Sequence, residues 1–226
     1  MARASSKTQS AAAAAPGPEP SAWRDAIANG AAELDEAAAA ARGCKACELW
    51  QRGTQTVFGE GGVQARMMLI GEQPGDQEDR DGKPFVGPAG RLLDRALAAA
   101  GVDRGALYVT NVVKHFYWEP RGKWRIHKKP KPQHIHACRP WLEAEIAALR
   151  PKVVLCLGAT AAQALFGASF RVSRDRGKWI ASAIAPRAMA TVHPSSLLRM
   201  PDDETRRSET RQFTADLKKA WKAAAD

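Results

Sequence analysis

The chain has 226 residues, of which 45% are hydrophobic and 26% charged. This composition is that of an ordinary globular protein, and it excludes a fibrous or wholly disordered chain. Lysine and arginine total 34 against 24 aspartates and glutamates, and the resulting net charge of +10 favours a polyanionic partner. No apolar run approaches the roughly 18 residues of a membrane span, so we expect no membrane association, no signal peptide and a cytoplasmic location.

The N-terminal part of the chain divides into two segments. Residues 1–20 carry alanine, serine, proline, glycine and a few charges, which predicts a disordered tail. Residues 21–226 form the single predicted domain. Its first stretch, residues 21–42, is alanine-rich with apolar residues at helical spacing and an Asn29-Gly30 interruption, which predicts one broken helix or two short ones.

The following elements alternate between strands and helices. We predict strands at 67–70, 107–113, 153–157 and 188–192, and helices at 88–100, 134–149, from 158 onward and at 204–223. A Gly/Pro/Asp loop follows the first strand, and a long polar loop runs from the second strand to Gln133. Continuous apolar strands between helices are typical of a parallel sheet covered on both faces. Ligands of such sheets bind beyond the carboxyl ends of the strands.

Two loops at these strand ends carry polar side chains, but neither is specific alone. The first, residues 71–76, reads GEQPGD and is equally well explained as a surface turn. It lacks the lysine of a phosphate-binding loop and the spacing of a dinucleotide-binding one. The second, residues 193–199, reads HPSSLLR, which also suits a helix start capped by Ser195 or Ser196.

Four cysteines in a chain without an export signal favour a metal or cluster site over a disulfide scaffold. Only Cys44 and Cys47 form a CxxC pair, and the second pair of a zinc ribbon is absent. Cys138 follows much later, and Cys156 lies inside an apolar strand, where it could be a plain core residue. From spacing alone, the metal site and the structural explanation stay equally open.

A basic stretch at residues 121–131 holds six lysines and arginines and no acid. Such a run is either a solvated loop or a surface that neutralises phosphates. The basic stretch contains His127, and the loop at 193–199 begins with His193. Of the remaining histidines, His134 and His136 suit surface or cap positions on a helix, and His115 suits a supporting or structural position.

Four separated motifs together resemble the uracil-DNA glycosylase superfamily, and within it the iron–sulfur family 4 enzymes. They are GEQPG at 71–75, GKPFVGPAG at 82–90, TNVVKH at 110–115 and HPSSLLR at 193–199. The loop KWRIH at 123–127 resembles that of the UdgX branch, which becomes covalently attached to uracil-containing DNA, although Trp124 departs from the branch pattern. Gln73, where hydrolytic family 4 enzymes commonly carry alanine, points to the same branch.

The resemblance implies a three-layer α/β/α fold with a central, mainly parallel four-stranded sheet. It implies the catalytic residues His127, Glu72 and His193. It implies a uracil pocket of Gly71, Gln73, Asp76, Phe85 and Asn111. It implies DNA contacts from Lys123, Arg125, Lys128, Lys129, Ser195 and Arg199. It implies a structural [4Fe–4S] cluster on Cys44, Cys47, Cys138 and Cys156. The implied partner is uracil-containing DNA, single-stranded or flipped from a duplex, and we expect a monomer.

Three functions remain open at this stage. In the first, neutral His127 attacks C1′ of the sugar while Glu72 holds the other ring nitrogen, and the protein is consumed in one turnover. In the second, water is the nucleophile and the protein is a conventional glycosylase. The third is a noncatalytic iron–sulfur DNA-binding protein. The intact set of Glu72, Phe85, Asn111 and His193 argues against the third, and His127 separates the first two.

Overall fold

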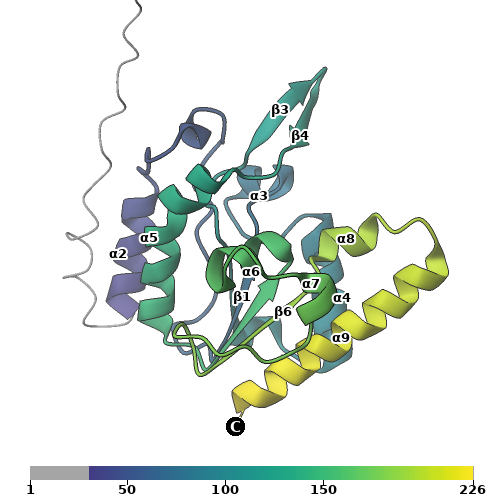
Figure 1. The fold of residues 1–226 in the computed structure, drawn as a ribbon. Helices are drawn as coiled ribbons and strands as arrows, with labels where there is room; N and C mark the ends of the chain where they lie inside the picture. The colour runs from purple at the N-terminus through teal and green to yellow at the C-terminus, as the bar shows by residue number, and fades with distance from the viewer. Residues whose placement is uncertain (1–30, 226) are drawn as a thin grey trace, which may run out of the picture.

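The computed structural model describes residues 31–225 (Figure 1). The expected tail at 1–20 and the first part of the expected N-terminal helix lie outside these residues. The described part of that helix is α2 (Ala31–Ala41), followed by the 3-10 turn η1 (Glu48–Gln51). Across residues 31–225, no helix has both the length and the apolar character needed to cross a bilayer.

A four-stranded parallel sheet forms the centre of the fold, as predicted. Its strands in spatial order are β2 (Leu107–Asn111), β1 (Met67–Gly71), β5 (Val153–Leu157) and β6 (Arg187–Thr191). Every residue of the first three is buried, because continuous apolar strands are covered on both faces. The second strand ends two residues before its predicted limit.

Helices cover both faces of the sheet, which gives the expected three layers. Met67 and Leu69 face α4 (Pro88–Ala100) and α9 (Asp203–Ala225). Met68 and Ile70 point to the opposite face, since successive side chains of a strand alternate. That face packs against α5 (Pro132–Leu149) and α6 (Ala159–Phe166), and α2 lies beside α5 (Figure 1).

Local signals fix several helix boundaries. Pro88 occupies the first turn of α4, where its missing N–H costs nothing, and Gly101 ends the helix with a left-handed φ of 73°. Two further turns, η2 (Arg104–Ala106) and α7 (Val172–Asp175), connect larger elements. The short helix α8 (Pro194–Leu198) follows β6.

Two elements contradict the predicted loops. The loop after the first strand contains the helix α3 (Asp76–Asp81), and the polar loop before Gln133 contains a hairpin of β3 (Trp118–Arg121) and β4 (Trp124–His127). The hairpin projects from the body of the molecule (Figure 1). Apolar Trp124 and Ile126 alternate with Arg125 and His127 in β4, but the strands are short and most of their residues are exposed, so the alternation is a weak signal within a basic stretch.

Candidate active site

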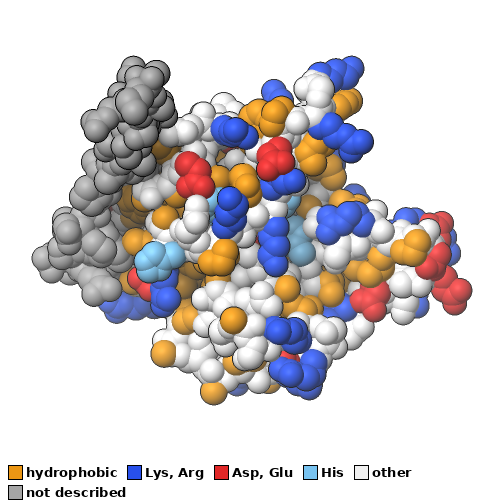
Figure 2. Space-filling model, turned by 45° about the horizontal axis from the view of Figure 1, so that its top comes forward, with side chains coloured by type: hydrophobic (Ala, Val, Ile, Leu, Met, Phe, Trp, Pro, Cys, Tyr) orange, Lys and Arg blue, Asp and Glu red, His pale blue; other side chains and the backbone are white. Residues whose placement is uncertain are grey.

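The candidate active site lies at the carboxyl end of the sheet, where the loops after β1, β2 and β6 meet the hairpin. Figure 2 shows Lys and Arg side chains around histidines on the end of the molecule that carries the hairpin. This placement is the one expected for ligands of a parallel sheet.

Three residues of the predicted uracil pocket pack closely together, namely Gly71, Phe85 and Asn111. Gly71 pairs with Asn111 across the β1–β2 register. A Cβ at Gly71 would lie 2.4 Å from Asn111 Oδ1 and 2.5 Å from the Phe85 ring. Asn111 is buried, yet its Oδ1 has no hydrogen-bond partner among the residues described. A buried amide oxygen without a partner is costly unless a ligand supplies a donor.

The turn around Phe85 is strained in a way that serves the pocket. Phe85 has a φ of 56°, in the left-handed region that a bulky residue rarely adopts. Gly90 permits this turn, because a Cβ there would lie 1.7 Å from the Phe85 carbonyl oxygen. The result places the Phe85 ring 5.8 Å from the His193 ring.

His193 is held in one tautomer by the helix that it caps. Its Nδ1 accepts the Ser195 backbone N–H at 3.1 Å and lies 2.8 Å from the Ser195 hydroxyl. Because Nδ1 is an acceptor, the ring proton resides on Nε2. Burial lowers the pKa of His193 to about 4, with His127 and Arg199 adding to the effect. His193 is therefore a neutral hydrogen-bond donor at neutral pH.

Glu72, which directly follows β1, lies beside His127 at the end of β4. One Glu72 oxygen accepts the hydroxyl of Thr160, in the first turn of α6, and the other lies 3.5 Å from His127 Nε2. Burial lowers the pKa of His127, Glu72 opposes this shift and Arg199 adds to it. The half-exposed imidazole is thus neutral at pH 7. Sequence reasoning missed Thr160, whose only signal was its position at a helix start.

Gln73 fixes the base of the hairpin. Its Nε2 donates to the carbonyl oxygens of Tyr117 at 3.2 Å and Lys128 at 3.0 Å, and its Oε1 accepts the Tyr117 N–H at 3.2 Å. These residues flank β3 and β4, so one buried side chain binds both ends of the element that carries His127.

Arg125 anchors the hairpin a second time. Its guanidinium pairs with Asp76 and lies 2.6 Å from the fully buried carboxylate of Asp79. The rings of Phe116 and Trp118 flank it at 5.4 Å each. Only 14% of the Arg125 side chain is exposed. The structure therefore places Asp76 and Arg125 against each other.

A family profile described as Uracil DNA glycosylase superfamily matches residues 58–223. The chain belongs to this superfamily. It is 38% identical to a type-4 uracil-DNA glycosylase of Thermotoga maritima over 165 residues, which cover 73% of this chain and 82% of the relative. A type-4 enzyme of Archaeoglobus fulgidus is 35% identical over 178 residues, covering 74% and 84%. A type-5 enzyme of Pyrobaculum aerophilum is 28% identical over 168 residues, covering 66% and 70%.

The residues predicted to contact DNA differ in their side-chain contacts and in their exposure to solvent. Lys128 pairs with Glu119 at 2.9 Å on the surface, and Lys123 lies over the ring of the exposed Trp124 at the hairpin tip. Lys129 and Arg199 are exposed. The Ser195 hydroxyl and N–H both face His193. Lysines 123, 128 and 129 and Arg199 therefore face solvent near the site, whereas Ser195 supports His193.

Three of the four cysteines converge between α2, η1 and α5. The thiols of Cys47 and Cys138 are hydrogen-bonded, which lowers the pKa of Cys47 to about 7 and raises that of Cys138. Trp141, one turn after Cys138, donates its indole N–H to Cys44 Sγ at 3.2 Å. Cys156 is fully buried in β5, in the same apolar cluster as Cys138. All four are free thiols.

These thiols are the right type of ligand for a metal cluster, but their side chains are not already arranged around one position. Within residues 31–225, no three His, Cys, Asp or Glu side chains lie close enough to hold a single ion. The donor set is nevertheless four unpaired thiols beside one helix and one strand, which is the ligand type that iron–sulfur clusters take.

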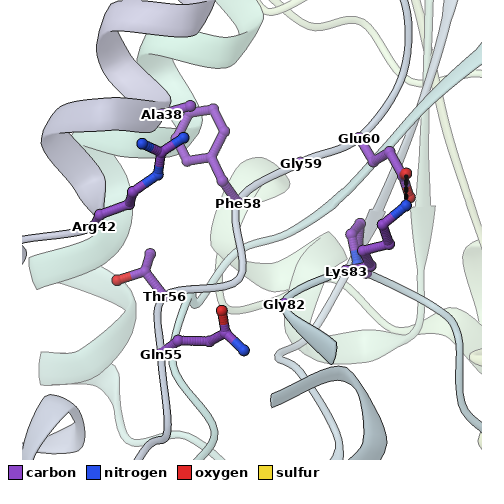
Figure 3. Close-up of a pocket in the computed structure, with 10 residues that line it drawn as sticks. Ala38, Arg42, Gln55, Thr56, Phe58, Gly59, Glu60, Gly82 and Lys83 are labelled. Carbon is purple, nitrogen blue, oxygen red and sulfur yellow. Dashed lines mark hydrogen bonds and ion pairs between the residues drawn. The ribbon is translucent and has the colours of Figure 1, made fainter. Parts of the chain in front are cut away.

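A separate cavity of about 450 Å³ lies between α2 and the loops at residues 55–60 and 82–84 (Figure 3). Lys83 and Glu60 form an ion pair of 3.1 Å at its edge. None of the predicted catalytic or pocket residues lines this cavity. This cavity is therefore distinct from the candidate active site at the carboxyl end of the sheet.

Proposed function

We propose that this protein excises uracil from DNA in base-excision repair and becomes joined to the sugar through His127 in a single turnover. Superfamily membership and the type-4 relatives support the glycosylase step. The covalent step is supported by one observation above all, the position of His127 Nε2 at 3.5 Å from a Glu72 oxygen, beside a burial that lowers the pKa of the imidazole.

Recognition of the base would use Asn111 and Phe85. Uracil presents a donor at N3 and an acceptor at O4, so Asn111 Oδ1 accepts the N3–H while its amide N–H donates to O4. Cytosine presents the reverse pattern and is rejected, because a buried amide would then face like groups. The Phe85 ring provides the stacking face, and the base must first leave the helix stack.

His193 would stabilise the departing base. Its Nε2–H is the free donor, since Nδ1 is occupied by Ser195. As the C1′–N1 bond breaks, the bonding electrons move onto uracil and negative charge builds on O2. A neutral donor aimed at that oxygen lowers the barrier in the manner of an oxyanion hole.

His127 would then capture the sugar. The lone pair of one imidazole nitrogen forms the bond to C1′, and the ring becomes positively charged. Glu72 faces the other ring nitrogen and stabilises that charge, while Thr160 keeps the carboxylate in place. The N-alkylated product persists unless the site can keep the departing ring protonated and admit water to C1′.

We also propose that Cys44, Cys47, Cys138 and Cys156 hold a [4Fe–4S] cluster, on the basis of the thiol convergence and the family resemblance. The role of the cluster would be structural, joining α2 and α5 to the sheet near the DNA-binding end. Protein purified without oxygen should contain about four irons and four sulfides per chain. Stoichiometric zinc without sulfide would contradict this assignment.

The experiment that tests the function is a reaction with a uracil-containing oligonucleotide, followed by boiling in detergent and electrophoresis. Wild-type protein should form a one-to-one adduct with uracil DNA and none with thymine or cytosine DNA. His127→Ala should abolish the adduct, whereas the matched control His136→Ala, an exposed histidine on α5, should retain it. Multiple turnovers with no adduct in the wild type would favour the hydrolytic alternative.

A further inference from the structure

A buried ion pair beneath the pocket has no part in the mechanism derived above. Lys114 Nζ lies 2.6 Å from Glu145 Oε2, and the two side chains are 1% and 0% exposed. Burying two charges costs several kcal/mol per ion before their attraction is counted, so such a pair is weak evidence of stability. Stability alone therefore does not account for the pair.

Lys114 uses all three of its ammonium donors at one place. Besides Glu145, Nζ donates to the Thr110 hydroxyl at 2.6 Å and to the Asn111 carbonyl oxygen at 2.8 Å. Thr110 and Asn111 are the last two residues of β2. Lys114 thus reaches back across the turn that follows β2 and closes it onto the strand end.

Glu145 fixes this lysine from the helix layer. Its Oε1 accepts from the Tyr108 hydroxyl at 3.1 Å, the Thr110 hydroxyl at 2.9 Å and the Gly59 N–H at 2.9 Å. The carboxylate, supplied by α5, is therefore fully used, and it holds the end of β2 and the segment before β1 together. Lys114 also donates its backbone N–H to Cys138 Sγ at 3.4 Å, and Cys138 lies on α5 two turns before Glu145.

Asn111, in contrast, has no side-chain hydrogen bond within residues 31–225, and its Oδ1 has no partner there at all. The direction of its amide is set by backbone position and by packing against Gly71 and Phe85. Lys114 gives the Asn111 backbone a charged contact through the bond to its carbonyl oxygen.

We infer that Lys114, held in place by Glu145, is a positioning residue for Asn111, and that its bond to the Asn111 carbonyl oxygen sets how well the site selects and holds uracil. This inference rests on the proposed function. A donor that is charged and buried keeps the Asn111 backbone within the few tenths of an ångström that hydrogen-bond readout of a base requires. The lysine touches no substrate atom, so its effect reaches the base only through Asn111.

The test compares two variants that separate positioning from folding. Lys114→Met/Glu145→Gln removes both charges but keeps volume, and the glutamine oxygen still accepts from Tyr108, Thr110 and Gly59. Glu145→Gln alone keeps Lys114 as a donor to Asn111. Free uracil as an inhibitor reports pocket quality, binding to thymine-containing DNA reports DNA association, and single-turnover adduct formation reports the reaction.

The double variant should fold and bind thymine-containing DNA as the wild type does. Its inhibition by uracil and its adduct rate at saturating uracil DNA should each fall roughly tenfold to a hundredfold, the equivalent of one hydrogen bond from a charged donor. Glu145→Gln should stay within about threefold of wild type in both readouts when compared at a temperature where it is folded.

Equal uracil inhibition and equal rates in the double variant and the wild type would overturn the inference while leaving the proposed function intact. A parallel loss in Glu145→Gln and the double variant would also overturn it, since the pair would then act through general packing. A wild-type protein that neither releases nor captures uracil would instead refute the proposed function itself.

Discussion

Replacing Arg125 with alanine separates two roles that the sequence alone cannot distinguish. The basic stretch suggests a phosphate contact, but the structure directs the guanidinium at Asp76 and Asp79. Without Arg125, the fully buried Asp79 carboxylate is left with the Thr54 N–H, at 2.9 and 3.1 Å from its two oxygens. The hairpin that carries His127 is then left with Gln73 as its buried polar anchor.

The size of the effect follows from burial. Losing one partner of a buried pair costs about 3–5 kcal/mol, and the remaining Thr54 hydrogen bonds reduce this to about 2–3 kcal/mol. The Asp76 pair adds little, because that carboxylate is 46% exposed. If the cost falls on ordering of the hairpin, adduct formation at saturating DNA should slow by roughly 30- to 150-fold.

The assay combines single-turnover adduct rates with the salt dependence of DNA affinity. Arg125→Ala should slow the adduct step and leave the salt slope unchanged, because an internal ion pair releases no counterions from DNA. Arg139→Ala, which breaks an exposed pair with Glu143 on α5, is the matched control and should change neither quantity. A smaller salt slope with a normal adduct rate in Arg125→Ala would show that Arg125 contacts phosphate and would refute this reasoning.

Three further predictions follow from the site. Lys128→Ala/Lys129→Ala should weaken binding to all DNA sequences and reduce the salt slope by about one for each phosphate that is no longer neutralised, as measured by filter binding at several salt concentrations. The adduct rate of this variant at saturating DNA should stay near that of the wild type. Asn111→Asp should weaken uracil selection, and Phe85→Ala should lose about 1–3 kcal/mol of stacking, both measured by competition between uracil and cytosine DNA. The adduct rate should be level above the ordinary histidine pKa of 6.5 and fall only below it, because the pKa of His127 is lowered by burial and protonation removes the attacking lone pair.

The sheet and several helices were predictable because their signals are local. The apolar run at Val153–Leu157 is typical of a buried strand, and Pro88 and Gly101 mark the two ends of α4. The hairpin was missed because its strands are short and mostly exposed, and the alternation of Trp124 and Ile126 with Arg125 and His127 is a weak signal within a basic stretch. Its position depends on Gln73, which is remote in sequence.

The candidate site was predictable as a set of residues but not as a set of contacts. The motifs suggested that Glu72 and His127 act together, and in the structure their side chains lie 3.5 Å apart. The pairing of Arg125 with Asp79 could not be predicted, because Asp79 lies on α3, in a segment for which the sequence predicted a loop. The charge of Arg125 can be read from the sequence, whereas the carboxylates that it contacts are known only from the structure.

If a His127 nitrogen forms the bond to DNA, the position of that bond can be measured directly. The adduct formed with a uracil oligonucleotide would be digested with nuclease and protease, and the modified peptide sequenced by tandem mass spectrometry. Attack by His127 predicts a deoxyribose-derived mass on that residue, with unmodified uracil released in equal amount. A sugar adduct on any other residue, or uracil release with no modified peptide, would contradict it.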